Sequence, residues 1–444
     1  MKMVLRDGLF RLNRLIKNNN IMRYVGNSAW MLAEQALKII SAIFVGIYVA
    51  RYLGPEQFGI FSYVLAIVSV FMGISLLGMN SILVRDLAFN LDKRQEYMGT
   101  AFWLMLFAAV ISILLLSVLV VFFEDDFQSK IYILVISISI IFQAFFVIDY
   151  NFQSQVKAKY SSIAKAIALG FSAISKLALV WLNAELFYFA LFYTVDSIIV
   201  AMILLCMHWY KKQPLFFYSF KFNLVKPLLI SAWPMVLSTI AGALYVRIDQ
   251  IMIKYMLSAH ELGLYAAAVR IYEGWLIVPY IISVSLIPAI VKLKSSSVED
   301  YEKNMTRIFS LLFWASAIMA LVMTIAGEYI ILLTFGAEFK DSSSVLGLVM
   351  WAATFSTLGA VTARYLTVEG MEKKIAIRTF LGLFLNVLMN IFLIPLYGIQ
   401  GAAIATLITL FFANYIINYF DKSLKQLLII CNRAITLKWI WNEK

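Results

Sequence analysis

Charged residues are scarce in this sequence: only 14% of the residues are Asp, Glu, Lys or Arg, whereas 63% are hydrophobic. Soluble domains contain roughly 25% charged and 45–50% apolar residues. A soluble fold would have too little polar surface to cover so much apolar area. The composition therefore excludes a soluble domain and predicts an all-α protein that crosses a membrane many times.

The residues that build metal and redox sites are nearly absent. The chain has two cysteines, Cys206 and Cys431, and two histidines, His208 and His260. The cysteine spacing fits no metal or redox motif, and the two histidines are expected at opposite helix ends, where they cannot form a dyad. There is also no Walker loop and no Asp-x-Asp pair. We therefore expect neither an enzyme nor a cofactor.

Most of the sequence consists of apolar runs of about 20 residues, the length needed to cross a bilayer. Six precede a polar connector at 211–226 and six follow it. The last two are divided by the turn signal Pro395-Leu396-Tyr397-Gly398. The twelve predicted spans are 25–50, 58–84, 100–123, 131–149, 161–183, 186–207, 227–253, 262–291, 308–330, 344–364, 377–395 and 399–420.

An internal repeat divides the chain in two. Ser28-Ala29-Trp30 recurs 203 positions later as Ser231-Ala232-Trp233, and Phe58-Gly59-Ile60-Phe61 aligns with Leu262-Gly263-Leu264-Tyr265 after one residue of slippage. A repeat of this length indicates two homologous halves rather than a solenoid. The predicted domains are a basic amphipathic segment at 1–24, a lobe at 25–210, the connector at 211–226, a lobe at 227–421 and a second basic amphipathic segment at 422–444.

The placement of the basic residues predicts the orientation. If the N-terminus is cytoplasmic, 29 of the 37 Lys and Arg residues lie in inner segments, and the outer loops hold only Arg51, Lys130, Lys254 and Lys340. Such an asymmetry over short loops follows the positive-inside rule. It places both termini in the cytoplasm and explains the net charge of +12 by contact with membrane lipids, without a nucleic-acid partner.

Eight charged residues inside the predicted spans are site candidates, because a charge there usually faces a partner or a wet cavity. Four are cations and four are anions: Lys38, Lys176, Arg247, Arg270, Glu34, Asp196, Asp249 and Glu273. This mixture suits a hydrated interior that handles a polar, charged cargo. The short outer loops leave no room for an external catalytic domain.

The spacing of these charges leaves several pairings open. Glu34 and Lys38 share a helix face and form either a self-neutralising pair or part of a cavity. Lys176 and Asp196 either pair across two helices or line a cavity. Arg247 and Asp249 point to different faces of one helix, which leaves Asp249 free to meet Arg270.

Three stretches resemble the polysaccharide transporter family, which includes the O-antigen flippases. They are Val49 to Gly59 (VARYLGPEQFG), Arg247 to Ile253 (RIDQIMI) with Gly263-Leu264-Tyr265, and Tyr397 to Thr406 (YGIQGAAIAT). The family belongs to the multidrug/oligosaccharidyl-lipid/polysaccharide exporter superfamily, and the resemblance covers essentially the whole chain. It implies two six-helix lobes around a central cavity, and movement of an undecaprenyl-pyrophosphate-linked oligosaccharide between the leaflets of a bacterial inner membrane by alternating access.

The resemblance also implies roles for residues. Lys38, Lys176, Arg247 and Arg270 are candidates for holding the anionic head of the cargo, with Arg51 at the outer mouth. The lipid II flippases of the superfamily have a sodium site, and the matching positions here are Asp249, Asn386, Asn390, Ala402 and Thr406.

Asn390 stands where those flippases have a second carboxylate, so sodium coupling competes with proton coupling. The candidates for proton coupling are Asp196, Asp249, Glu273 and Glu34. A third interpretation gives the two asparagines, Asn386 and Asn390, only structural hydrogen bonds.

Other functions remain as alternatives. A cation-coupled drug or metabolite antiporter of the same superfamily is one, and a membrane-bound polysaccharide polymerase or ligase is another. A lipid II flippase is a third, although that group usually has fourteen spans. A polysaccharide polymerase and a chain-length regulator are further expected partners of a flippase.

Overall fold

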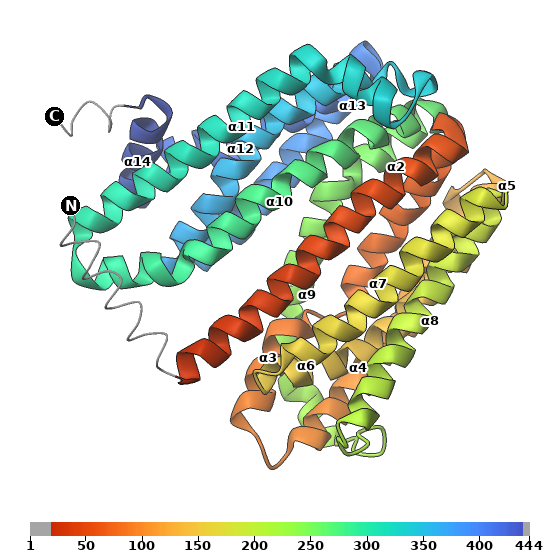
Figure 1. Cartoon of the computed structure of the whole chain (residues 1–444), viewed down its shortest axis with the longest axis vertical. Coiled ribbons are helices and arrows are strands. Elements are labelled where there is room, and N and C mark those ends of the chain that lie inside the picture. Colours follow the sequence, from red (N-terminus) through yellow and green to blue (C-terminus); the bar gives the residue numbers. More distant parts are fainter. Residues whose placement is uncertain (1–18, 438–444) are drawn as a thin grey trace. The chain divides into compact units, whose positions relative to one another are not determined.

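The chain is helical throughout the residues that the computed structural model describes, 19–437. Figure 1 shows long helices joined by short connections. The first part of the chain contains α2 (Asn19–Ser75), α3 (Met79–Phe89), α4 (Arg94–Phe123), α5 (Phe127–Ser137), the 3₁₀ helix η1 (Ile138–Phe146), α6 (Val147–Ser154), α7 (Ala158–Trp181) and α8 (Leu186–Tyr210). The second part contains α9 (Phe222–Met256), α10 (Ala259–Ser296), α11 (Val298–Thr334), η2 (Ala337–Phe339), α12 (Ser342–Val368), α13 (Glu372–Asn414), η3 (Ile416–Tyr419), η4 (Lys422–Leu424) and α14 (Lys425–Ile435).

Ten helical segments within 19–437 are long and apolar enough to cross a membrane. Two of them, 26–89 and 372–419, are far longer than one crossing requires. Within them, α2 is interrupted by the non-helical backbone angles of Gly54, and α13 by those of Gly398. Each of these segments therefore holds two crossings, and the twelve predicted spans all have a counterpart. The chain is an all-α, multi-pass membrane protein.

Local sequence explains the break in α2. Gly54 has a φ of 71° and a ψ of 170°, and it precedes Pro55. A proline disfavours the helical conformation of the residue before it, and glycine adopts a positive φ without a steric penalty. The break in α13 at Gly398 (φ 57°, ψ −139°) follows Pro395, at the turn predicted from the sequence.

The chain forms two compact units, and neither matches one half of the sequence. Within the described residues, the first contains 19–41, 71–178 and 188–236, and the second contains 42–70, 179–187 and 237–437. The predicted lobe boundaries at 25–210 and 227–421 divide the chain by its repeat, whereas the compact units exchange short segments. The residues around Gly54 thus belong to the second unit.

The core of the first unit is apolar and aromatic. Met79, Leu83 and Leu87 of α3 are fully buried against residues of α4 and α6. Phe102 of α4 makes edge contacts with Phe145, Phe216 and Phe217 at centroid distances of 5.1–5.6 Å. These contacts join α4 to the segment that connects α8 and α9.

In the second unit, α11, α12 and α13 run alongside one another and α10 packs on α12 (Figure 1). The helix α14 covers one end of α11 with its apolar side. Leu427, Ile430 and Cys431 are fully buried there. Burial raises the pKa of the Cys431 thiol to about 12. The described part of the predicted segment 422–444 therefore has an apolar side that contacts protein.

The predicted N-terminal segment 1–24 lies mostly outside the described residues, as do residues 438–444 of the C-terminal one. Many large apolar side chains of the described helices are exposed. Phe107 and Leu114 of α4 and Ile174 of α7 are 61–70% exposed. A helix that is apolar on its outer face as well as its inner one is typical of a helix that contacts lipid.

Candidate functional sites in the spanning helices

A charged cluster lies in the first unit, on three different helices. Lys165 of α7 forms ion pairs with Glu34 of α2 (2.7 Å) and Asp149 of α6 (3.1 Å). The side chains of the two carboxylates are only 12% and 6% exposed, and Asp149 Oδ1 is buried without a partner. One lysine thus pairs with two carboxylates, which leaves a net negative charge. Within residues 19–437 no ion pair joins Glu34 to Lys38, so the self-neutralising pair on α2 is not formed.

A second pair in this unit joins α7 to α8. Lys176 Nζ lies 3.1 Å from Asp196 Oδ2, and it donates to Ser172 Oγ over 2.7 Å. Ser172 in turn donates to Asp196. Of the two arrangements that the sequence left open for Lys176 and Asp196, the direct pair across two helices is present.

A cationic cluster lies in the second unit, where α9 meets α10. Arg247 Nη1 lies 3.0 Å from Glu273 Oε1, and both side chains are 30% exposed. Arg270, one turn before Glu273 on α10, interacts electrostatically with both. It extends towards α2, where a Cβ at Gly46 would lie 3.3 Å from its Nε. In the described chain Arg270 has no ion-pair partner, so the cluster holds two cations against one anion.

Asp249 of α9 is the centre of a buried polar site in the same unit. Its Oδ1 accepts a hydrogen bond from Asn390 Nδ2 (2.7 Å), and its Oδ2 accepts from Thr406 Oγ1 (2.5 Å) and Tyr265 Oη (2.8 Å). Asp249 is 7% exposed and Asn390 is fully buried. The encounter of Asp249 with Arg270 that the sequence left open does not occur; among residues 19–437 the carboxylate contacts only neutral donors.

The break at Gly398 allows one long helix to contribute both Asn390 and Thr406 to this site. Oxygen atoms gather around the carboxylate. Asn386 Oδ1 accepts from Asn390 Nδ2 over 3.1 Å, Thr406 Oγ1 lies 3.0 Å from the carbonyl of Ala402, and Asn390 Oδ1 is buried without a partner. Oxygens of this kind suit a hard cation. Asp249, Asn386, Asn390 and Thr406, the four residues expected from the sequence, are therefore adjacent and compatible with sodium.

The remaining candidates lie apart from these clusters. Lys38 is an exposed residue of α2. Arg51 lies at the break in α2, where its Nη1 donates to the carbonyl of Leu333 over 3.5 Å. Nothing in the structure assigns either residue a cargo-binding role, and for both that role stays a prediction.

Sequence reasoning missed three members of these sites. Lys165 falls inside the predicted span 161–183 and Asp149 is the last residue of the span 131–149, but neither is among the candidates named from the sequence. Tyr265 is part of the second repeat motif. A stricter rule, in which every charge inside a predicted span is a site candidate, finds Lys165 and Asp149. Only the fold brings Tyr265 to Asp249.

The sequence matches one family model and known relatives. Residues 25–294 match the family described as polysaccharide biosynthesis protein. A putative O-antigen transporter from Shigella flexneri is 22% identical over 417 residues, which cover 86% of this chain and 94% of the relative.

Solved structures with a similar fold include transporters of different kinds. The inward closed structure of the lipid II flippase MurJ is similar with a TM-score of 0.70 at 15% identity, over 92% of this chain and 91% of that one. An inward-facing multidrug resistance MATE family transporter of the MOP superfamily has the same TM-score at 14% identity, over 90% and 95%. The shared fold therefore does not distinguish a lipid-linked cargo from a drug.

Proposed function

Because the chain belongs to the polysaccharide biosynthesis protein family, we propose that it is a transporter that moves a lipid-linked oligosaccharide across the membrane, and not an enzyme. The similarity to an O-antigen transporter over nearly the full length of both chains supports this cargo class. We propose undecaprenyl pyrophosphate as the lipid carrier, the bacterial cytoplasmic membrane as the location, cytoplasmic termini, and transport towards the outer leaflet.

The observation that carries the proposal is the excess positive charge of Arg247, Arg270 and Glu273. A charge in a spanning helix is costly unless it has a partner or water. The carboxylate of Glu273 forms an ion pair with Arg247. Arg270 is therefore available to bind an anionic group of the cargo. Guanidinium groups bind phosphate oxygens through paired hydrogen bonds. A pyrophosphate head held at Arg270 can cross the apolar region while its polyprenyl tail stays in lipid.

The surroundings of the Asp249 carboxylate support the proposal that transport is coupled to an ion. A buried carboxylate that contacts only neutral donors lacks a compensating charge, and either a sodium ion or a proton supplies it. The oxygens of Asn386, Asn390 and Thr406 would hold sodium beside Asp249. Binding and release of this ion would bias the rocking of the two repeats that exposes the cargo site to each side in turn.

The test is the loss of Arg270. We expect Arg270→Ala to lower surface polysaccharide at least about tenfold, because one charge-assisted hydrogen bond contributes about 1.5–3 kcal/mol and 1.4 kcal/mol is a factor of ten. The protein level in the membrane is measured in parallel. Arg85→Ala is the control, since the Arg85 side chain is 57% exposed and pairs with its neighbour Asp86.

Normal surface polysaccharide in the Arg270→Ala strain, at normal protein level, would contradict a cargo-holding role. The drug-antiporter alternative makes the opposite prediction: polysaccharide stays normal and resistance to cationic drugs changes. Measuring both in the same strains separates the two functions.

A further inference from the structure

A 3₁₀ helix interrupts one spanning segment of the first unit. The segment 127–154 consists of α5, η1 and α6, and nine residues in its middle, Ile138–Phe146, form η1. Runs of 3₁₀ helix longer than roughly three or four residues are uncommon, because their hydrogen bonds are poorer than those of an α-helix. The sequence of η1, ISIIFQAFF, has no proline or glycine that would disfavour an α-helix. Contacts with other parts of the chain must therefore hold the 3₁₀ form.

Two hydroxyl groups bind the backbone just before η1. Thr194 of α8, which is 5% exposed, donates to the carbonyl of Val135 over 2.7 Å. Ser137 donates to the carbonyl of Leu134 over 2.7 Å. In an α-helix each of these carbonyls accepts from the N–H group four residues further on, and a hydroxyl that binds the same carbonyl competes with that bond. The hydroxyls therefore favour the 3₁₀ form at the point where η1 begins.

The form of η1 determines which face of α6 points towards Lys165. A 3₁₀ helix rises about 2.0 Å and turns about 120° per residue, against about 1.5 Å and 100° for an α-helix. Over the nine residues of η1, conversion to an α-helix would reduce the length from about 18 Å to about 13.5 Å and turn α6 by about half a turn relative to α5. Asp149, the third residue of α6, would then leave Lys165.

Asn151 would take the place of Asp149. Two residues of α-helix correspond to about 3 Å and 200°, so Asn151 would arrive within about 1.5 Å and 20° of the present position of Asp149. Asn151 is fully buried, and within the described chain its Nδ2 has no hydrogen-bond partner; the same holds for Asp149 Oδ1. Two opposite faces of α6 thus each carry a buried polar atom with an unmet hydrogen bond. A helix with two orientations accounts for both.

The ion pair between Asp149 and Lys165 opposes this rotation. Rotation would leave the carboxylate buried without a cation, which is costly. With Asn151 in its place, Lys165 and Glu34 would form a pair of equal and opposite charges, and the amide could accept from Lys165 and donate to Glu34. Loss of the charge on Asp149 therefore favours the α-helical form.

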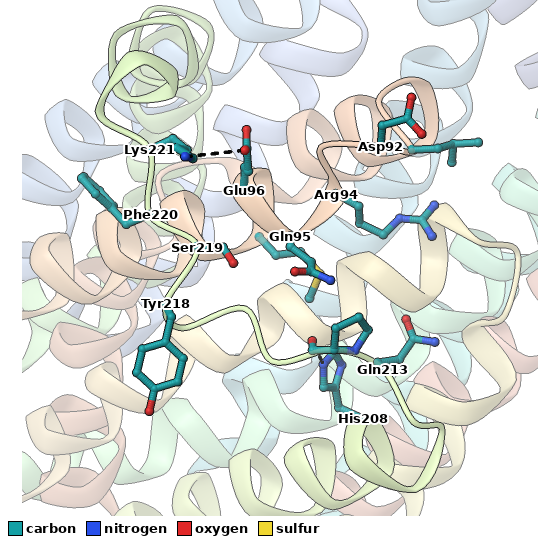
Figure 2. Close-up of a pocket in the computed structure, with 13 residues that line it drawn as sticks. Asp92, Arg94, Gln95, Glu96, His208, Gln213, Tyr218, Ser219, Phe220 and Lys221 are labelled. Carbon is teal, nitrogen blue, oxygen red and sulfur yellow. Dashed lines mark hydrogen bonds and ion pairs between the residues drawn. The ribbon is translucent and has the colours of Figure 1, made fainter.

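The far end of α6 is not firmly attached to the segment that connects α8 and α9. Gln155, directly after α6, donates to Gln213 Oε1 over 3.4 Å, which is long for a hydrogen bond. Figure 2 shows Gln213 beside a cavity of about 570 Å³ between the start of α4 and the end of α8. This contact can therefore break without disturbing a tightly packed core.

We propose that η1 is a conformational switch, which alternates between a 3₁₀ and an α-helical form during transport. The ion pair of Asp149 with Lys165 and the hydrogen bond from Thr194 to Val135 hold the 3₁₀ form. In the α-helical form the spanning segment is shorter, and Asn151 replaces Asp149 beside Lys165. The role in transport rests on the proposed function, whereas the existence of two forms does not.

Two nitroxide labels measure the two forms by double electron–electron resonance in lipid nanodiscs. They are attached at Gln128→Cys in α5, an exposed position, and at Gln153→Cys in α6, a half-buried one. Cys206→Ser removes the exposed cysteine, and the buried Cys431 stays. The labels lie about 160° apart around the helix axis in the 3₁₀ form and about 20° apart in the α-helical form, so the two distances should differ by more than about 4.5 Å.

Two substitutions should shift the balance between the two distances. Asp149→Asn removes the charge that opposes rotation, and Thr194→Val removes the hydrogen bond to Val135. Each should raise the population with the shorter distance about fivefold or more, the effect of one hydrogen bond. The control labels, at Gln95→Cys and Phe122→Cys on the uninterrupted α4, should give one distance that neither substitution changes. A single, identical distance across η1 in the unaltered protein and in both variants would overturn the proposal.

An insertion tests whether transport requires the switch. Two alanines added after Ala144 allow the whole segment to be α-helical, while Asp149 stays within about 1.5 Å and 20° of its present position. This variant should give one distance close to the longer one, and its surface polysaccharide should fall to the level of a deletion strain. Two alanines added after Asp125, in the loop before α5, are the control. Normal polysaccharide in the η1 variant would reject the role of η1 in transport.

The two measurements separate this inference from the proposed function. Two distances in a protein that moves no lipid-linked oligosaccharide would retain the switch and reject the transport function. Transport of lipid-linked oligosaccharide by a protein with one distance would do the reverse.

Discussion

Gly59 and Gly263 are equivalent residues of the two internal repeats, and each packs against backbone of the other repeat. A methyl group added at Gly59 would lie 1.8 Å from the carbonyl oxygen of Ala259, and one at Gly263 would lie 1.8 Å from that of Pro55. Pro55 and Ala259 are themselves equivalent, since both pairs are 204 positions apart. The contact is thus reciprocal, and it holds the starts of two repeat helices together within the second unit.

This contact predicts that neither glycine tolerates alanine. Gly59→Ala and Gly263→Ala should each destabilise the protein by about 1–3 kcal/mol or more, because a rigid carbonyl cannot yield to the added carbon. Gly242→Ala is the matched control, since nothing lies within 4 Å of its Cβ position and alanine favours the helix. Thermal melting in detergent measures the difference. Equal melting temperatures for all three variants would contradict the close approach.

A second prediction concerns Lys165, which forms ion pairs with both Glu34 and Asp149. Lys165→Met should destabilise the first unit by about 3–5 kcal/mol, the usual cost of breaking a buried ion pair by removing one partner. Adding Asp149→Asn removes one of the two stranded carboxylates and should restore part of the melting temperature. A double variant no more stable than Lys165→Met would show that the cost has another source.

The pair Lys176–Asp196 allows structure and function to be separated. Lys176→Ala strands the partly exposed carboxylate of Asp196 and should cost about 1–3 kcal/mol; Lys176→Ala with Asp196→Ala should regain that stability. If Lys176 also holds the cargo, the double variant still makes little surface polysaccharide. Full recovery of both melting temperature and polysaccharide would reduce Lys176 to a structural partner of Asp196.

Sodium is tested at Asp249. At a sodium concentration of about 100 Kd a bound ion stabilises the folded state by about 2.7 kcal/mol. The purified protein should therefore melt at a higher temperature in sodium than in choline. This difference should vanish in Asp249→Asn and persist in Asp196→Asn, which removes a charge from the first unit. A difference that survives in Asp249→Asn would place sodium elsewhere, and none in the unaltered protein would favour the proton.

Much of this architecture was predictable because a bilayer imposes simple rules on a chain. The length of apolar runs gives the twelve spans, and the turn signal at Pro395 to Gly398 gives the break within α13. The repeat gives the two halves. The polar site around Asp249 followed from a resemblance in three motifs, and its four expected residues are adjacent.

The partners of individual charges were not predictable, because they depend on how helices distant in sequence are rotated against one another. Glu34 pairs with Lys165 on α7 rather than with Lys38 one turn away. Asp249 contacts Tyr265 rather than Arg270. Both of these residues lie on α10, and the rotation of that helix about its axis determines which of them faces Asp249. The compact units likewise depart from the repeat boundaries, because residues 42–70 pack with the second unit.

The most direct measurement of the central claim is the location of lipid-linked repeat units in a strain from which the gene has been deleted. The account predicts that undecaprenyl-pyrophosphate-linked oligosaccharide accumulates in the cytoplasmic leaflet. It also predicts that the unaltered protein, but not Arg270→Ala, restores transfer to the outer leaflet. Normal amounts in the outer leaflet of the deletion strain, with no accumulation inside, would contradict it.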